Sequence, residues 1–302
     1  MATVYEIVTD KIIMALKSGV VPWHRPWSAG TPHTSLVTMR PYRGVNVLLL
    51  TLSALSNGFE SPYWLSLNQA KKLGIRVKYS EMRNSTLITF WLKKDKKEDS
   101  EENSEEPESA EKASTRFILR YYLVWNLDQC EPETVPASLK AKFKALENNQ
   151  LDQFSVNEVA ERIVTGMPNP PTMRSVEDRA YYSPALDIVN MPKRETFVSE
   201  SSYYQILFHE LAHSTGHASR LARKGITDID SFASHQYSQE ELIAEMTAAF
   251  LCAMVGIEYT MEQSASYIAS WLKALNNDSR MLVFAASQAQ KAADYIIGKC
   301  DE

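Results

Sequence analysis

The stretch FHELAHSTGH, residues 208–217, places His209 and His213 four positions apart, with Glu210 directly after the first histidine. Residues at this spacing lie on one face of an α-helix, so their imidazole nitrogens can bind a single Zn²⁺ ion. Gly216 is a suitable residue to end such a helix soon after His213. The HExxH spacing therefore predicts a short helix that carries a metal centre.

A catalytic zinc centre needs a third protein ligand, and the segment SQEELIAE, residues 238–245, offers candidates. Ser238 is a suitable N-cap for a second helix, on which Glu241 and Glu245 share a face. A carboxylate one turn after a glutamate ligand often orients a ligating histidine. We assign Glu241 to the metal and Glu245 to that orienting role. The reverse assignment stays open, as does a solvated acidic face without any metal.

Two further positions bear on the ligand set. In metzincins a third histidine follows six residues after the second one, but that position is Ser219 in this chain, so this subclass is excluded. His217 has the wrong spacing to complete a tetrahedral site. On a helix that continued past Gly216, His217 would lie one turn above His213. We therefore expect His217 to support the ligands from outside or merely to adjoin them.

Glu210 is the predicted catalytic residue. It would accept a proton from a water molecule activated by the ion and pass it to the leaving amine, which is the chemistry of peptide-bond hydrolysis. A structural zinc normally has four protein ligands instead. Spacing does not select one metal, so Zn²⁺ is expected while Mn²⁺ or another divalent ion also fits these donors. The alternative is two unrelated histidines beside an accidental glutamate.

Composition restricts the class of protein. The chain has 302 residues, 44% of them hydrophobic and 23% charged, which is typical of a packed protein with about two domains. The sequence has no apolar run long enough to cross a membrane, and Glu6 and Asp10 interrupt the opening segment, so we expect neither membrane insertion nor export. Three widely spaced cysteines indicate no disulfide framework and favour the cytoplasm.

Charge is distributed unevenly along the chain. Residues 1–94 contain 12 Lys and Arg against 4 Asp and Glu, whereas residues 151–302 contain 12 against 20. Between them, residues 95–114 contain 9 acidic and 3 basic residues. Phosphate binding depends on the local density of cations, so the net charge of −5 does not argue against a nucleic-acid partner of the N-terminal third.

The basic N-terminal third also contains many aromatic residues. Cations can follow the phosphates of a single strand while exposed aromatic rings stack on its unpaired bases. The alternative, at about even odds, is that the tryptophans belong to the core and the cations only solvate a surface. The candidate residues for binding single-stranded DNA are Trp23, Arg25, Trp27, Arg40, Tyr42, Arg43, Lys71, Lys72, Arg76 and Lys78.

Periodicity predicts an α+β fold with two domains. The first, residues 1–130, is a small mixed α/β domain, in which the acidic residues 93–114 form a flexible insertion at the tip of a hairpin. A linker follows at residues 131–150, and a mainly helical domain occupies residues 151–302. Patterns of apolar residues predict helices at 4–16, 45–55 and 64–73, and strands at 75–79, 86–91 and 117–125.

Several of these segments also carry a family resemblance. In the N-terminal half they are WHRPW (23–27), PYRGVNVLL (41–49) and WLSLNQA (64–70), and in the C-terminal half they are residues 208–217, Arg220-Leu221 and residues 240–251. With these motifs the chain resembles the ArdC-type antirestriction proteins of conjugative plasmids along essentially its full length. The family's N-terminal domain, which is related to a module of conjugative primases, binds single-stranded DNA. Its C-terminal domain is a zincin-like metallopeptidase, and residues 95–114 look like an insertion into the family's compact domain.

The resemblance implies protection of incoming plasmid DNA from host restriction enzymes, with a host protein connected to restriction as the substrate or target. Two other functions remain open at this point. The chain could bind single-stranded DNA while its metal-binding zincin fold is catalytically idle. It could also be a zinc metallopeptidase whose basic domain binds an acidic protein.

Overall fold

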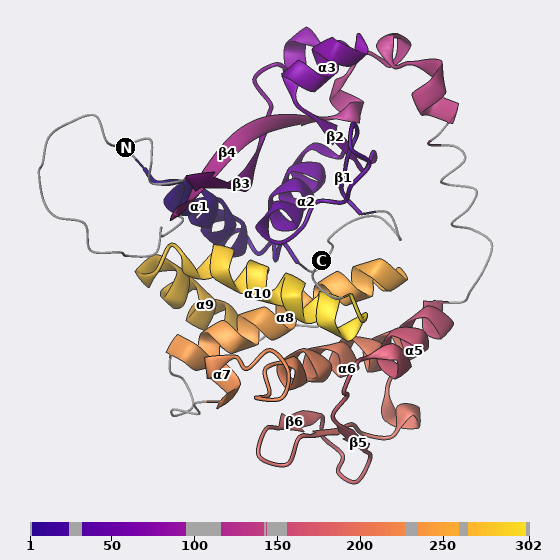
Figure 1. Cartoon of the computed structure of the whole chain (residues 1–302), viewed down its shortest axis with the longest axis vertical. Coiled ribbons are helices and arrows are strands. Elements are labelled where there is room, and N and C mark those ends of the chain that lie inside the picture. The colour runs from indigo at the N-terminus through magenta and orange to yellow at the C-terminus, as the bar shows by residue number, and fades with distance from the viewer. Residues whose placement is uncertain are drawn as a thin grey trace, which may run out of the picture.

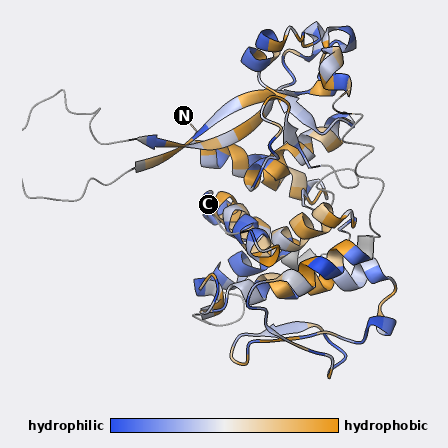
Figure 2. Cartoon of the chain, turned by 45° about the vertical axis from the view of Figure 1, so that its right-hand side comes forward, coloured by the Kyte–Doolittle hydropathy of each residue, from blue (hydrophilic) through white to orange (hydrophobic). Residues whose placement is uncertain are grey.

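The computed structural model describes residues 2–23, 32–94, 116–141, 143, 156–227, 235–259 and 265–299. Figure 1 shows a sheet-containing N-terminal part above a layer of helices, with a second small sheet below them. Figure 2 shows hydrophobic residues on the helices that lie between the upper sheet and the lower helical layer. The predicted α+β architecture is confirmed.

Among the described residues, the N-terminal part contains the helices α1, α2 and α3 and one sheet. Helix α1 (Val4–Lys17) begins with a capping box between Thr3 and Glu6. The other helices are α2 (Val45–Asn57) and α3 (Leu67–Leu73). The sheet has the order β1-β2-β4-β3, and its strands are β1 (Thr34–Ser35), β2 (Tyr63–Leu65), β3 (Thr86–Lys94) and β4 (Arg116–Asn126).

Strands β3 and β4 form a long antiparallel hairpin, paired from Thr86 and Val124 to Lys94 and Arg116. The two predicted strands are therefore confirmed, and the acidic segment lies between them in the sequence. Its residues 95–114 lie outside the described residues. Lys93 and Lys94 belong to β3, so the insertion does not begin at residue 93.

Two predicted elements are wrong. The predicted helix 64–73 is a strand followed by a helix, because the Ser66 side chain accepts a hydrogen bond from the Gln69 backbone and starts α3 at Leu67. Residues 63–65 pair with both β1 and β4. The predicted strand 75–79 is only an isolated bridge between Val77 and Cys130. In both segments, backbone pairing with residues distant in the sequence determines the observed structure.

The C-terminal part is mainly helical, as predicted, and also contains a small sheet. Its helices are α5 (Val156–Gly166), α6 (Glu200–Thr215), α7 (Lys224–Thr227), α8 (His235–Val255), α9 (Ala265–Asn277) and α10 (Met281–Ile296). The sheet has the order β5-β7-β6, with strands β5 (Thr172–Arg174), β6 (Tyr181–Ser183) and β7 (Ile188–Asn190). Helix α8 packs against α6 on one side and α10 on another, so it occupies the middle of this part.

The two parts share a hydrophobic core. Val8 of α1 and Leu48 of α2 belong to the same buried cluster as Leu242 of α8 and Ala286 of α10. The predicted linker also begins too early, because Val135 is buried in a small N-terminal core and Tyr63 stacks on Phe143 with ring centroids 4.2 Å apart. The other predicted domain limit, residue 151, lies outside the described residues.

Cys130 and Cys252 are buried free thiols, whereas Cys300 lies outside the described residues.

Among the residues that the structure describes, none of the helices is long and apolar enough to cross a membrane.

Candidate metal centre

Helix α6 carries the HExxH residues on a buried face. The helix begins at an N-cap, Ser199, and ends at Gly216, as predicted for the C-terminal end. His209 and Glu210 are buried, and His213 is nearly so, because α6 packs along α8. This packing brings the predicted ligands of one helix against the acidic residues of the next.

The three predicted metal ligands lie close together. The Nε2 atoms of His209 and His213 are 3.1 Å apart. Each Nε2 atom is 3.6 Å from a carboxylate oxygen of Glu241. One ligand atom from each residue lies within 4.8 Å of the other two. Ligand atoms bound tetrahedrally to one Zn²⁺ are separated by about 3.3 Å, so this donor set fits a divalent ion with little movement.

The outer nitrogens of both histidines face different glutamates. His209 Nδ1 lies 3.5 Å from Glu245 Oε1, which matches the orienting position assigned to Glu245 from the sequence. Glu245 is itself held by a 2.7 Å hydrogen bond from the Tyr259 hydroxyl. His213 Nδ1 lies 3.5 Å from Glu240 Oε1. Glu240 therefore has a place at the site that the sequence reasoning did not assign.

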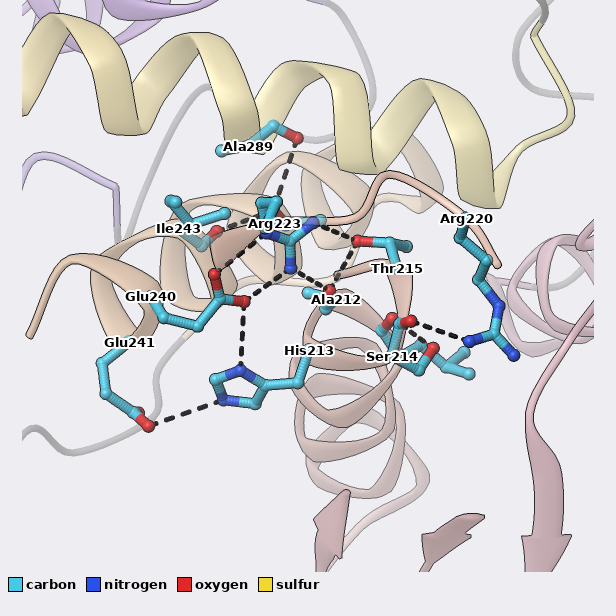
Figure 3. Close-up of polar contacts among 12 residues, drawn as sticks. Ala212, His213, Ser214, Thr215, Arg220, Arg223, Glu240, Glu241, Ile243 and Ala289 are labelled. Atoms are coloured by element: carbon cyan, nitrogen blue, oxygen red, sulfur yellow. Dashed lines mark hydrogen bonds and ion pairs between the residues drawn. The ribbon is translucent and has the colours of Figure 1, made fainter. Parts of the chain in front are cut away.

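Glu240 is held in turn by a buried arginine. Arg223 Nε and Nη2 donate to the two carboxylate oxygens of Glu240 at 2.9 and 2.5 Å. Figure 3 shows this chain of contacts from Arg223 through Glu240 to His213, with Glu241 at the opposite edge of the imidazole. No sequence spacing pointed to Arg223, because it lies in the loop between α6 and α7.

The charges around the site favour ionised acids and a protonated histidine. Burial alone would raise the pKa of Glu241, but His213 and His209 outweigh it and lower that pKa to about 2. Burial alone would likewise lower the pKa of His209, yet the contact with Glu241 and the charges of Glu245 and Glu210 raise it to about 9. A metal ion that binds here therefore competes with a proton.

Glu210 lies on α6 directly after His209 and is buried. Its charge contributes to the raised pKa of His209. In the HExxH pattern, the glutamate directly after the first histidine is the general base. Its role in a reaction stays a prediction.

His217 lies directly after the end of α6. Its Nδ1 atom contacts the Ser219 hydroxyl at 2.8 Å and accepts a hydrogen bond from the Ser219 backbone. Helix α6 ends before it, as expected from Gly216, so His217 does not continue the ligand face. The turn that follows Gly216 directs the chain away from the helical path.

Several predicted DNA-binding residues have structural roles instead. Trp23 is fully buried and contacts Trp271 of α9 edge to face at 5.4 Å, so it cannot stack on a base in this conformation. Tyr42 packs on the buried cluster that includes Trp64. Arg43 forms an ion pair with Asp294 of α10. For Trp23, the alternative interpretation that the tryptophans belong to the core is therefore the correct one.

The other predicted cations differ in their surroundings. Arg76 pairs with Glu131 at 2.9 Å, and Lys78 donates to the backbone carbonyl of Asp128. Arg40, Lys71 and Lys72 are exposed. Arg25 and Trp27 lie outside the described residues. Of the eight candidates that the structure describes, Trp23 therefore lies away from the surface.

Exposed aromatic side chains instead line the hairpin of β3 and β4. The consecutive aromatic residues at 90–91 and 121–122 in the two predicted strands could have signalled them. Phe90 is 40% exposed and lies opposite Arg120 in the strand register, with the Tyr122 ring centroid 5.7 Å away. The exposed aromatic residues of the hairpin are Phe90, Trp91, Phe117, Tyr121 and Tyr122.

Two family models match this chain. Residues 2–125 match the N-terminal domain of the anti-restriction factor ArdC. Residues 159–288 match a zincin-like metallopeptidase. The first match covers the sheet of the N-terminal part, and the second covers α6, α8 and the three predicted metal ligands.

Similar proteins match nearly the whole chain. A protein named y4eC from Sinorhizobium fredii is 32% identical over 299 residues, which cover 97% of this chain and 91% of that protein. Two DNA primases TraC from Escherichia coli are each 30% identical over 97% of this chain. The chain spans only 20% and 27% of the lengths of these two primases.

Two crystal structures of the antirestriction protein ArdC from plasmid R388 have the same fold. The metal-free structure matches with a TM-score of 0.75 and 32% identity, over 98% of this chain and 97% of that one. The Mn(II)-bound structure matches with a TM-score of 0.74 and 31% identity, over 99% and 98% of the two chains.

Proposed function

This chain belongs to the ArdC family of antirestriction proteins, and we propose that it binds single-stranded DNA through its N-terminal part while α6 and α8 form a metal-dependent peptidase centre. Together these activities would protect incoming plasmid DNA from host restriction in the cytoplasm. The observation that carries the enzymatic half is the convergence of His209, His213 and Glu241.

The donor set supports a divalent ion. Two imidazoles and one carboxylate are common ligands of catalytic zinc and leave one position open. The same donors accept Mn²⁺, and the Mn(II)-bound structure of the R388 protein shows that ion in a relative. We propose Zn²⁺ as the resident ion, with Mn²⁺ as the alternative. When bound, such an ion supplies a Lewis acid that polarises a carbonyl and lowers the pKa of water.

The protein's own residues perform the proton transfer in this proposal. Glu210 accepts a proton from the attacking water and then donates it to the nitrogen of the leaving amine. Burial of Glu210 on α6 supports this role, because the surrounding helices limit access of bulk water to the carboxylate. A host protein connected with restriction is the proposed substrate or target.

The DNA-binding half has different support. The N-terminal part has an excess of cations, and the hairpin presents Phe90 and Tyr122 beside Arg120. An exposed ring can stack on an unpaired base while a neighbouring guanidinium contacts a phosphate. We propose this surface of the hairpin as part of the binding site for single-stranded DNA.

One substitution separates an active peptidase from an idle one. Glu210→Gln removes the general base while it keeps the size of the side chain. We expect the variant to bind metal and single-stranded DNA as the wild type does, but to lose antirestriction in cells that carry a restriction system. Unchanged antirestriction with intact binding would favour a DNA-binding protein with an idle metal centre.

A second experiment distinguishes DNA from an acidic protein as the partner of the basic part. A short labelled oligonucleotide is titrated into the protein at several salt concentrations. Strand binding predicts an affinity that falls steeply as the salt concentration rises. The Lys and Arg residues of the protein release counterions from the phosphates on binding, and added salt opposes this release. Absence of oligonucleotide binding at low salt would favour a peptidase whose basic part binds an acidic protein.

A further inference from the structure

Arg223 connects the two helices that carry the metal ligands. Its Nη1 atom donates to Thr215 Oγ1 at 2.6 Å, and its Nη2 atom donates to the carbonyl of Ala212 at 2.8 Å, both on α6. The same guanidinium holds both carboxylate oxygens of Glu240 on α8. Arg223 is only 7% exposed, so water screens these contacts very little.

Glu240 lies between this arginine and a metal ligand. Its Oε1 atom, which accepts the 2.5 Å hydrogen bond from Arg223, is also 3.5 Å from His213 Nδ1. His213 Nδ1 is buried and has no hydrogen-bond partner among the described residues. A shift of a few tenths of an ångström would turn this contact into a hydrogen bond, since such bonds measure about 2.7–3.2 Å.

We propose that Arg223 and Glu240 form a positioning pair that orients His213 toward the metal. This inference rests on the proposed metal centre. A carboxylate on Nδ1 fixes the tautomer in which Nε2 is free to bind an ion, and it restrains rotation of the ring. Arg223 keeps that carboxylate in place, because a buried carboxylate without a cation would be strongly unfavourable.

The three glutamates of α8 face different nitrogen atoms of the two histidines. Glu240, Glu241 and Glu245 all lie on α8 and all contact a ligating histidine. Arg223 occupies both oxygens of Glu240, and the Tyr259 hydroxyl bonds to Glu245. Glu241 contacts the Nε2 atoms of both histidines. Glu241 is thus distinguished as the third ligand by its contact with the Nε2 atoms of both histidines, and it also has a hydrogen bond with Tyr237.

Two glycines allow the loop to bring Arg223 into this position. A side chain at Gly216 would place its Cβ 2.5 Å from Ile226 and 3.0 Å from Arg223 Nη2. A side chain at Gly225 would place its Cβ 3.0 Å from the Cβ of Glu240. A side chain at Gly216 would clash with Ile226, and one at Gly225, in α7, would push against Glu240, so the segment from Gly216 to Gly225 packs tightly over the pair.

The chain offers a matched control in Arg220. Its side chain is fully buried, pairs with Asp187 at 2.7 Å and donates to the carbonyl of Ser214 on α6. It therefore resembles Arg223 in burial, in its carboxylate partner and in its contact with the end of α6. Asp187, unlike Glu240, has no described contact with His209 or His213.

The test uses the full-length protein with Arg223→Gln, Arg223→Lys, Glu240→Gln and Arg220→Gln. Zn(II) affinity is measured by competition with a chromophoric chelator, the ligand geometry by the absorption spectrum of Co(II), and the fold by thermal unfolding without metal. We expect Arg223→Gln and Glu240→Gln each to weaken Zn(II) binding about 10- to 100-fold and to alter the Co(II) spectrum. Arg223→Lys keeps a cation near Glu240 and should lose less.

Control and double variants complete the test. Arg220→Gln should lower the unfolding temperature but change Zn(II) affinity less than twofold. The double variant Arg223→Gln/Glu240→Gln should bind Zn(II) about as weakly as Glu240→Gln alone, because both residues act through one contact. If Arg220→Gln does not fold, Asp187→Asn takes its place.

The outcomes separate this inference from the proposed function. A wild-type protein that binds neither Zn(II), Mn(II) nor Co(II) would overturn the metal centre itself. A wild-type protein that binds Zn(II), together with Glu240→Gln of unchanged affinity and spectrum, would overturn only the positioning pair. If Arg223→Gln does not fold, Glu240→Gln and Arg223→Lys decide the question. Equal losses of affinity in Arg220→Gln and Arg223→Gln would assign Arg223 a purely structural role and so also overturn the pair.

Discussion

Arg43, in the turn before α2, forms an ion pair with Asp294 of α10. The backbone N–H of the next residue, Gly44, donates to Gln290 on the same helix. Helix α10 packs against α8, which carries the glutamates of the metal centre. The segment that the sequence assigned to DNA therefore joins the N-terminal part to the layer of helices around the metal ligands.

This contact predicts an effect on stability. Arg43→Ala leaves the carboxylate of Asp294, which is 8% exposed, without its cation. Because the arginine itself is half exposed, we expect the free energy of unfolding to fall by only about 1 to 2 kcal/mol. Denaturant unfolding measures the change, and DNA affinity should stay within twofold. A large loss of DNA affinity in a stably folded variant would indicate that Arg43 contacts DNA.

A second prediction concerns Trp23. Trp23→Ala should lower the free energy of unfolding by about 3 to 5 kcal/mol, because it removes a fully buried ring that packs on Trp271. Trp23→Phe keeps an aromatic ring and should fold. We expect Trp23→Phe to bind a labelled oligonucleotide with wild-type affinity, as measured by fluorescence anisotropy. Weaker binding by this folded variant would show that the indole contacts DNA.

A third prediction tests the hairpin as a DNA-binding surface. Phe90→Ala should weaken binding of a single strand by about 1 to 3 kcal/mol, the usual contribution of one stacked base. Arg120→Gln should reduce the salt dependence of the affinity by about one phosphate contact. Tyr79, in a 3₁₀ turn at Tyr79–Glu81, is 94% exposed and serves as the matched aromatic control. Loss of affinity in Tyr79→Ala but not in Phe90→Ala would contradict the proposed surface.

A fourth prediction concerns the third metal ligand. Glu241→Ala removes the carboxylate nearest to both Nε2 atoms and should abolish tight binding of Zn(II). Glu245→Gln affects only the orientation of His209 and should weaken binding about 10- to 100-fold. Isothermal titration of both variants with Zn(II) compares the two losses directly. A larger loss in Glu245→Gln would reverse the assignment.

A fifth prediction is a pH dependence of metal binding. The pKa of His209 is raised to about 9 in the metal-free protein, so at neutral pH a metal ion must displace a proton. Zn(II) affinity should therefore rise with pH until about pH 9, by up to about tenfold per pH unit. Titrations in buffers with different ionisation enthalpies measure the released proton. Binding at pH 7 without proton release would contradict the raised pKa.

The same shift has the opposite effect on the metal-free protein. A histidine whose pKa is higher in the folded state than its ordinary value of about 6.5 stabilises the fold below that value. This contribution is lost as the pH rises through about 9. We expect thermal unfolding without metal to shift to lower temperature between pH 7 and 9, and Glu245→Gln to reduce the shift.

Residue patterns within single segments of the sequence were sufficient to predict some of the helices and strands. The spacing of His209, Glu210 and His213 and the glycine after them were sufficient to predict the course of α6. Runs of β-branched, aromatic and other apolar residues on both sides of the acidic segment predicted the strands of the hairpin. The pair Glu241 and Glu245 could be assigned because the two residues are one helical turn apart and face the same neighbour.

The sequence by itself thus predicted two helices of the candidate centre, its three convergent candidate ligands and the division into a basic and an acidic part, because helix periodicity and charge are local properties. Only the tertiary structure decided that Trp23 is buried, that Arg43 contacts α10 and that Arg223 reaches Glu240. Each of these contacts joins residues from separate elements. Packing between helices and strands determines which side chains come into contact, and the spacing of residues within one segment does not predict these contacts.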